Sequence, residues 1–88
     1  NPNTRIQEDY LRILRYFRFL SRFLNNIDSS SFNACIKYSK NLNLLSSERL
    51  LLELNKILIC KNSYFIMDKM YKNNVILDII CCMTYIFQ

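Results

Sequence analysis

Apolar residues recur along the chain with the spacing of amphipathic helices, and short polar breaks separate them. The clearest stretch runs from residue 6 to residue 24. At about 100° per residue, one side of it collects apolar side chains: Ile6, Tyr10, Ile13, Leu14, Phe17, Leu20 and Leu24. The other side collects charged ones: Arg5, Glu8, Arg12, Arg15, Arg18 and Arg22. The pattern predicts one long helix with a core face and a basic face.

The same periodicity predicts shorter helices downstream. Their expected ranges are residues 29–40, 46–59, 63–71 and 75–80 or beyond. Serines that precede the apolar positions are the expected N-caps: Ser29, Ser30 or Ser31, then Ser46 or Ser47, then Ser63. The chain has no glycine, so asparagines such as those at 25–26 and 73–74 are expected to supply the tight turns. We therefore expect an all-α protein, a small bundle of four to five short helices, with almost no strand.

The basic residues are unevenly placed. The formal net charge is +5, and five of the twelve basic residues are arginines between Arg5 and Arg22. A basic stripe on one helix is typical of a surface that binds a polyanion. Leu11, Tyr16, Phe19 and Phe23 lie among these arginines. Aromatic side chains at that spacing more often pack against a neighbouring helix than stack on bases, so we expect packing here.

The cysteines and the absence of histidine argue against a metal site. None of the four cysteines forms a C-x-x-C pair, and a zinc site needs four nitrogen or sulfur ligands. Reduced thiols in a cytoplasmic protein are favoured over a disulfide. The start of the sequence is polar and does not resemble a signal peptide. The apolar stretch 75–87 is shorter than the ~20 residues of a membrane-spanning helix, so we expect no membrane association.

The acidic pair at the start of the long helix is the first candidate for chemistry. Glu8 and Arg12 are spaced i,i+4 and Asp9 and Arg12 i,i+3, so all three can meet on one helix surface. The simplest interpretation is an exposed ladder of ion pairs. Each such pair contributes only a few tenths of a kcal/mol.

A second interpretation is that this cluster reads a base. Cytosine and adenine each present an amino donor beside a ring-nitrogen acceptor. Asp9 can accept from the amino group while Arg12 donates to the ring nitrogen. Guanine and uracil present the opposite polarity and would leave buried polar groups unpaired. Arg15 and Arg18, about one and two turns further on, can neutralise phosphate charge.

The remaining polar residues suggest support rather than catalysis. Arg49 and Glu53 are spaced i,i+4, and the simplest interpretation is an ion pair on a capped helix. Asp68 and Asp78 stand alone and are expected to be exposed. The sequence shows no Gly-rich loop, nucleophile–base pair or metal-ligand cluster. We therefore assign no catalytic residue and no metal ligand, and expect that this chain alone is not catalytic.

Two segments resemble a known family. The run from Arg5 to Phe19 contains an acidic pair, two variable residues and an arginine, and it resembles the nucleobase-recognition motif of class II tRNA nucleotidyltransferases (CCA-adding enzymes) and bacterial poly(A) polymerases. The run from Leu45 to Leu54 resembles the next motif of that family, a Ser-Glu-Arg helix start followed by a glutamate. The resemblance covers roughly residues 5–78.

The resemblance implies a role for each residue of the first motif. Asp9 and Arg12 select CTP and ATP as a protein template, and Glu8 helps to hold that pair. Arg15 and Arg18 contact the incoming nucleotide. In the second motif, the helix that carries Arg49 and Glu53 supports the template helix.

The resemblance also implies how the chain is organised. Residues 1–61 correspond to the nucleotide-recognition helices of the all-helical neck, and residues 62–88 to a truncated start of the helical body. The family's catalytic head, which carries the Mg²⁺ ligands, is absent, so Mg²⁺ is expected only with a separate head-domain chain. The expected partners are CTP, ATP and a tRNA or RNA 3′ end. Two alternatives stay open: a non-catalytic helical module that binds RNA or protein, and an inactive gene remnant.

Overall fold

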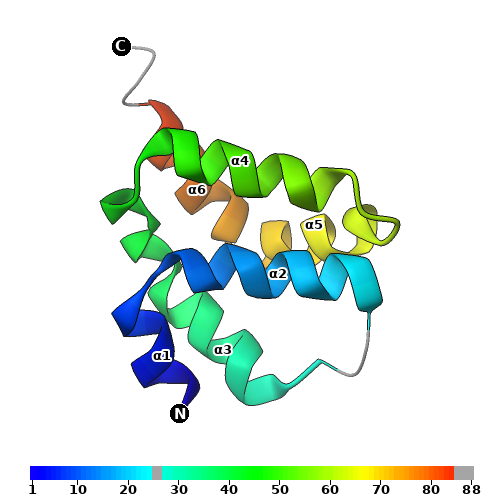
Figure 1. The fold of residues 1–88 in the computed structure, drawn as a ribbon, viewed down its shortest axis with the longest axis horizontal. Coiled ribbons are helices and arrows are strands. Elements are labelled where there is room, and N and C mark those ends of the chain that lie inside the picture. The colour runs from blue at the N-terminus through cyan, green and yellow to red at the C-terminus, as the bar shows by residue number, and fades with distance from the viewer. Residues whose placement is uncertain (25–26, 85–88) are drawn as a thin grey trace.

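The computed structural model describes residues 1–24 and 27–84, with side chains up to residue 81. This part is all α-helical, apart from one short 3-10 helix, as the sequence predicts (Figure 1). Its elements are α1 (Pro2–Glu8), α2 (Leu11–Phe23), α3 (Ser29–Tyr38), η1 (Ser39–Leu44), α4 (Ser47–Leu58), α5 (Ser63–Lys72) and α6 (Val75–Thr84). The described ranges thus hold six α-helices, so the expected number of four to five is wrong.

The extra helix arises because the first expected helix is interrupted at Asp9. Its backbone is extended, with φ −156° and ψ 105°, and α1 ends there. The Asp9 Oδ1 atom accepts a hydrogen bond of 3.0 Å from the Leu11 N–H and so caps the first turn of α2. A short aspartate side chain competes in this way with continued helix. The prediction of one helix from Ile6 to Leu24 is therefore wrong.

The N-caps of the later helices follow local side-chain chemistry. Ser46 caps α4 by accepting a hydrogen bond of 3.3 Å from the Arg49 N–H, in agreement with one of the two predicted positions. Asp28 caps α3 in place of the predicted serines. Its carboxylate accepts from the Ser30 and Ser31 N–H groups and, at 2.7 Å, from the Ser31 hydroxyl. A carboxylate is preferred there because it can accept several donors at the positive end of the helix.

Replacing Asp28 with alanine is expected to lower the melting temperature at neutral pH. The hydrogen bond from the Ser31 hydroxyl, followed by those from the two N–H groups, lowers the pKa of Asp28 below 3.8. A lowered pKa in the folded state stabilises the protein above pH 3.8, and this contribution is lost as the pH falls through the folded-state value. Thermal unfolding of both proteins checks this prediction. A difference that persists undiminished at pH 2 would contradict it.

Two residues with positive φ angles end helices. Asn74 has φ 66° between α5 and α6, which confirms the expected use of asparagine at that turn. Leu24 has φ 42° and ends α2, with its N–H donating to the Leu20 carbonyl at 2.8 Å. Leu24 is therefore a partly exposed terminus and not a core residue, unlike the expectation. The asparagines at 25–26 lie outside the described residues.

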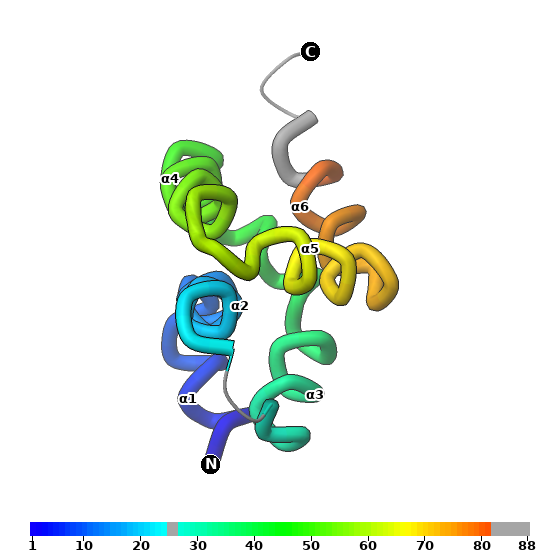
Figure 2. Tube along the Cα trace, turned by 90° about the vertical axis from the view of Figure 1, so that its right-hand side faces the viewer, coloured from blue at the N-terminus to red at the C-terminus, as the bar shows by residue number. Residues whose placement is uncertain are grey.

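Helix α2 lies at the centre of the packing. It packs against α4 and α5, while α1 packs against α3 and α6 against η1 and α5. In Figure 2, α2 and α4 lie on one side and α3 and α6 on the other, with α5 running between them. The buried residues of α2 are Leu11, Ile13, Leu14, Phe17, Leu20 and Ser21. Four of these were predicted for the core face, whereas Leu11 was placed among the arginines.

The joint between α3 and α4 is anchored to α6. Ser39 is buried, and its hydroxyl lies 2.6 Å from Asp78 Oδ2 and 3.0 Å from the Ile36 carbonyl oxygen. Asp78 is therefore a partly buried structural residue, and the prediction that it is isolated and exposed is wrong. Asp68 forms an ion pair of 3.0 Å with Lys72 on the surface of α5. Within the described ranges, no helix is long and apolar enough to cross a membrane. The expected neck–body boundary after residue 61 stays a prediction.

Candidate nucleotide and nucleic-acid site

The turn between α1 and α2 brings Asp9 and Arg12 together through the backbone. The Arg12 N–H donates to the Asp9 carbonyl oxygen at 3.1 Å. The ion-pair partner of Asp9 is Arg15, whose Nη1 atom lies 3.9 Å from Asp9 Oδ2. That distance is the upper limit of an ion pair, and both side chains are partly exposed, so the contact is weak. One oxygen of Asp9 thus caps the turn, and the other makes only this long contact with Arg15, in a side chain that is 35% exposed.

The side-chain cluster of Glu8, Asp9 and Arg12 that the helical spacing predicts does not form. Glu8 is the last residue of α1, so helical i,i+4 spacing does not extend from it to Arg12. Among the described residues, neither Glu8 nor Arg12 forms an ion pair. Arg12 instead lines a cavity of about 490 Å³ between α1, α2 and α3, together with Arg5 and Arg15. Its guanidinium group is therefore free of an acidic partner in this part of the chain.

The same cavity is lined by Tyr16 and Cys35, which the sequence did not identify as candidate site residues. The Tyr16 hydroxyl oxygen is buried near the backbone of Asp28, and burial raises its pKa. Burial also raises the pKa of Cys35 to about 12, so this thiol is not a nucleophile at neutral pH. Cys35 and Cys60 are free thiols. The lining of the cavity therefore combines the neutral Tyr16 and Cys35 side chains with three arginines.

Glu53 connects α4 to the basic face of α2. Its side chain is 7% exposed and lies 3.2 Å from Arg18 Nη1 and 3.7 Å from Lys56 Nζ. Its Oε2 atom accepts no directed hydrogen bond within the described residues, so the Arg18 contact is an ion pair of imperfect orientation. The expected pairing of Glu53 with Arg49 is wrong. Glu53 faces the α2–α4 contact, whereas Arg49 is exposed in the first turn of α4.

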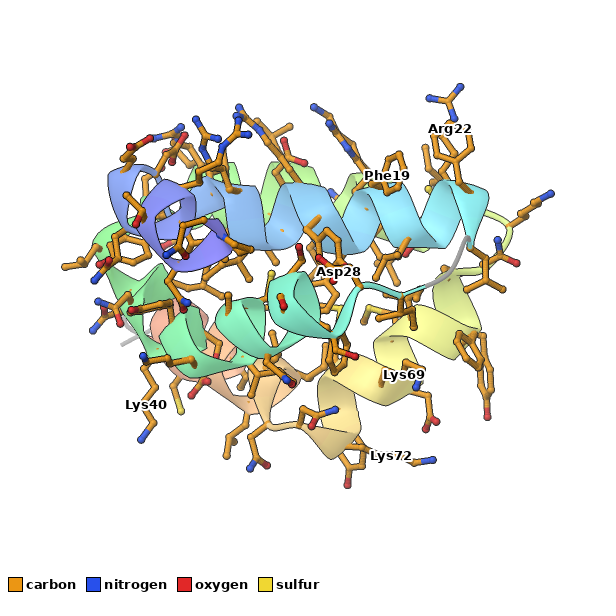
Figure 3. The ribbon with its side chains drawn as sticks, turned by 90° about the horizontal axis from the view of Figure 1, so that it is seen from below. Phe19, Arg22, Asp28, Lys40, Lys69 and Lys72 are labelled. Carbon is orange, nitrogen blue, oxygen red and sulfur yellow. The ribbon has the colours of Figure 1, made fainter. Side chains whose placement is uncertain are left out.

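A basic groove lies beside this ion pair, along the C-terminal halves of α2 and α4. Its volume is about 750 Å³. Its lining residues are Arg15, Arg18, Phe19, Arg22, Phe23, Lys56, Ile59 and Cys60. Figure 3 shows Phe19 and Arg22 pointing from the same side of α2, away from α3 and α5. We call this feature the α2–α4 groove. Its lining contains four cations and no carboxylate.

The described residues offer no cluster of three His, Cys, Asp or Glu side chains that is suited to a metal ion. The residues that line the cavity and the α2–α4 groove instead carry mainly hydrogen-bond donors and positive charge. Asp9 supplies a carboxylate at the α1–α2 turn beside them. Such a surface suits a ligand with anionic groups and mixed donor and acceptor edges.

Residues 26–80 match a family model described as the probable RNA and SrmB-binding site of polymerase A. The match covers more than half of the chain, and it includes α3, α4 and α5. The chain belongs to the poly(A) polymerase and tRNA nucleotidyltransferase family. The α4 wall of the α2–α4 groove lies inside the matched region, and the α2 wall lies outside it.

Curated relatives in this family are named as CCA-adding proteins. The chain is 48% identical over 58 residues to the mitochondrial CCA tRNA nucleotidyltransferase 1 of Homo sapiens, which covers 62% of this chain and 13% of the human protein. It is 36% identical over 78 residues to the CCA-adding enzyme of Staphylococcus epidermidis, covering 85% of this chain and 20% of that enzyme. The chain thus spans no more than about a fifth of these two relatives.

Proposed function

We propose that this chain is the nucleobase-recognition and RNA-binding part of a nucleotidyltransferase that adds CMP and AMP to RNA 3′ ends. The observation that carries the proposal is the α1–α2 turn. There one Asp9 oxygen makes only a long 3.9 Å contact with Arg15, in a partly exposed side chain, and Arg12 has no acidic partner in the described part. The family supports RNA as the polymer, since the matching family model is described as an RNA-binding site.

The turn supplies the two polarities that cytosine and adenine require. The hydrogen bond from the Leu11 N–H fixes the orientation of the Asp9 carboxylate. Its second oxygen accepts from the exocyclic amino group of the base, and this interaction displaces the weak 3.9 Å contact with Arg15. Arg12 donates to the neighbouring ring nitrogen. A preorganised pair of this kind rejects guanine and uracil, because their reversed polarity leaves buried groups unpaired.

The arginines next to the turn supply charge for the phosphates of the incoming nucleotide. Arg15 lines both the cavity that contains Arg12 and the α2–α4 groove. Release from Asp9 frees its guanidinium for a phosphate. Arg18 is held by Glu53, so its position is fixed before the ligand arrives. Glu53 is thus a positioning residue for Arg18.

The transfer reaction itself needs groups that the described residues do not supply. Magnesium-dependent nucleotidyl transfer uses carboxylate ligands held together, and no cluster suited to a metal ion occurs in the described part. We therefore assign the Mg²⁺ site to a head domain outside this sequence, carried on a partner chain or on the same polypeptide. In this proposal the enzyme works in the cytoplasm, although the human relative is named as mitochondrial.

Substitution at the turn is expected to abolish base discrimination. The wild-type chain should bind ATP and CTP more tightly than GTP and UTP. Asp9→Asn keeps an oxygen to cap Leu11 but replaces the second acceptor with a donor, so the preference should fall by about tenfold or more. Arg12→Ala should weaken the binding of ATP and CTP by a similar factor. Isothermal titration with the four nucleotides measures both changes.

The control for this experiment is Lys40→Ala, which removes one exposed positive charge from η1 that lines neither the cavity nor the α2–α4 groove. It should leave the order of the four affinities unchanged. Equal affinity of the wild-type chain for all four nucleotides, unaltered by either substitution at the turn, would refute base recognition here. Incorporation of labelled CMP or AMP by this chain alone would refute the assignment of catalysis to another domain.

A further inference from the structure

The α2–α4 groove has the features of a binding site for a single nucleic-acid strand. Two aromatic rings project into it from adjacent turns of α2. Phe19 is 49% and Phe23 52% exposed, and their ring centroids are 5.1 Å apart. The expected packing of these rings against neighbouring residues is only partial, since about half of each side chain is exposed. They therefore present flat apolar surfaces to the groove, on which bases can stack.

Positive charge surrounds these rings. Arg15, Arg18, Arg22 and Lys56 line the groove, and the guanidinium carbon of Arg22 lies 5.4 Å from the centroid of the Phe23 ring. Two carboxylates, Asp9 and Glu53, contact three of these four cations. The four cations therefore exceed these two carboxylates by two positive charges. Arg22 forms no ion pair within the described part and is available to a phosphate.

The groove is elongated along α2. Its α2 residues recur at i, i+3, i+4, i+7 and i+8. The opposite side is lined by Lys56 near the end of α4 and by Ile59 and Cys60, which follow that helix. The distance along α2 from Arg15 to Arg22 is about 10 Å at 1.5 Å per residue. Along this length two phenylalanines are interspersed among three arginines. Such a surface suits a polymer that presents both phosphates and bases.

We propose that the α2–α4 groove binds the single-stranded 3′ end of the RNA, with bases stacked on Phe19 and Phe23 and phosphates paired with Arg22 and Lys56. This proposal rests on the proposed function for the identity of the polymer. Arg15 joins the groove to the α1–α2 turn, because it lines the groove and contacts Asp9. A strand in the groove therefore ends beside the base selected by Asp9 and Arg12. A duplex does not fit as well, because its bases are paired and stacked on one another.

The test is fluorescence anisotropy with a labelled single-stranded RNA, compared with a blunt RNA duplex of the same length. The double variant Phe19→Ala/Phe23→Ala should bind the single strand about tenfold or more weakly. A matched control, Tyr64→Ala/Tyr71→Ala, removes two exposed aromatic rings from α5 and should change affinity less than twofold. A second double variant, Phe19→Leu/Phe23→Leu, keeps apolar bulk but lacks the π faces. It should also lose affinity, even if the alanine variant folds poorly.

Salt dependence tests the phosphate contacts. Arg22→Ala should lower the slope of log K against log salt by about 0.7, the value for one phosphate contact of a single strand. Lys40→Ala removes the same charge elsewhere and should leave the slope unchanged. Unchanged RNA affinity in both phenylalanine variants would overturn the groove proposal. So would equal binding of the duplex, or of poly-glutamate, which would indicate an acidic protein partner.

The two proposals fail in different ways. The phenylalanine variants should keep the preference for ATP and CTP, whereas Asp9→Asn should keep the affinity for single-stranded RNA. If the phenylalanine variants instead lose nucleotide preference while RNA affinity stays constant, the groove belongs to the nucleotide and the RNA proposal is overturned. If Asp9→Asn has no effect on nucleotide preference but the phenylalanine variants lose RNA affinity, the groove proposal stands and base recognition at the turn fails.

Discussion

Replacing Phe17 with alanine is expected to lower the free energy of unfolding by about 3–5 kcal/mol. Phe17 is fully buried in the central helix and contacts Phe32 edge to face, with ring centroids 6.1 Å apart at 86°. Removing the ring leaves a cavity that the surrounding helices can close only in part. Small domains have total stabilities near the lower end of about 5–15 kcal/mol. The variant should therefore be largely unfolded at moderate urea concentrations at which the wild type is folded.

Urea denaturation followed by circular dichroism measures the change. Phe23→Ala is a matched control on the same helix, because Phe23 is half-exposed. It should lower the free energy of unfolding by only about 1 kcal/mol, because half of the ring is exposed and its main contact is the Phe19 ring. If the two variants are equally stable, the core is not centred on α2 as described.

Replacing Arg18 with alanine is expected to destabilise the protein by about 1–3 kcal/mol. The cost arises from Glu53, whose nearly buried carboxylate loses its 3.2 Å partner and keeps only the more distant Lys56. Solvent reaches the partly exposed Arg18, so the lower part of that range is expected. Arg49→Ala should have almost no effect, because Arg49 is exposed and does not pair with Glu53.

A double variant separates charge from packing in this prediction. Glu53→Gln removes the unpaired negative charge, so Arg18→Ala/Glu53→Gln should be more stable than Arg18→Ala alone. Thermal and urea unfolding of the four proteins complete a double-mutant cycle. A larger loss from Arg49→Ala than from Arg18→Ala would show that Glu53 pairs within α4, as the sequence spacing suggested.

The sequence predicts the helical class and most of the buried face of α2, because both depend on a periodic pattern. Ile13, Leu14, Phe17 and Leu20 fall on the expected side and are buried. The helix break at Asp9 could not be predicted from that pattern, because the apolar periodicity continues across it. Only the local hydrogen bond from the Leu11 N–H to the Asp9 side chain decides that one helix ends and another begins.

The candidate site shows a similar limit. Sequence spacing can name residues that are able to pair, but tertiary packing selects the partner. Glu53 pairs with Arg18 across two helices instead of with Arg49 along its own, and Asp9 contacts Arg15 instead of Arg12. The aromatic rings of the α2–α4 groove were expected to pack against a neighbouring helix. Their exposure depends on which helices surround α2, and the sequence of residues 11–23 does not contain that information.

We propose above that the turn carrying Asp9 and Arg12 selects the base. The most direct test is a heteronuclear NMR titration of the isotope-labelled chain with ATP and, separately, with GTP. ATP is expected to shift the backbone and side-chain signals of Asp9, Arg12 and Arg15 at concentrations where GTP shifts them little. Identical shifts with both nucleotides, or shifts confined to residues outside this turn, would contradict it.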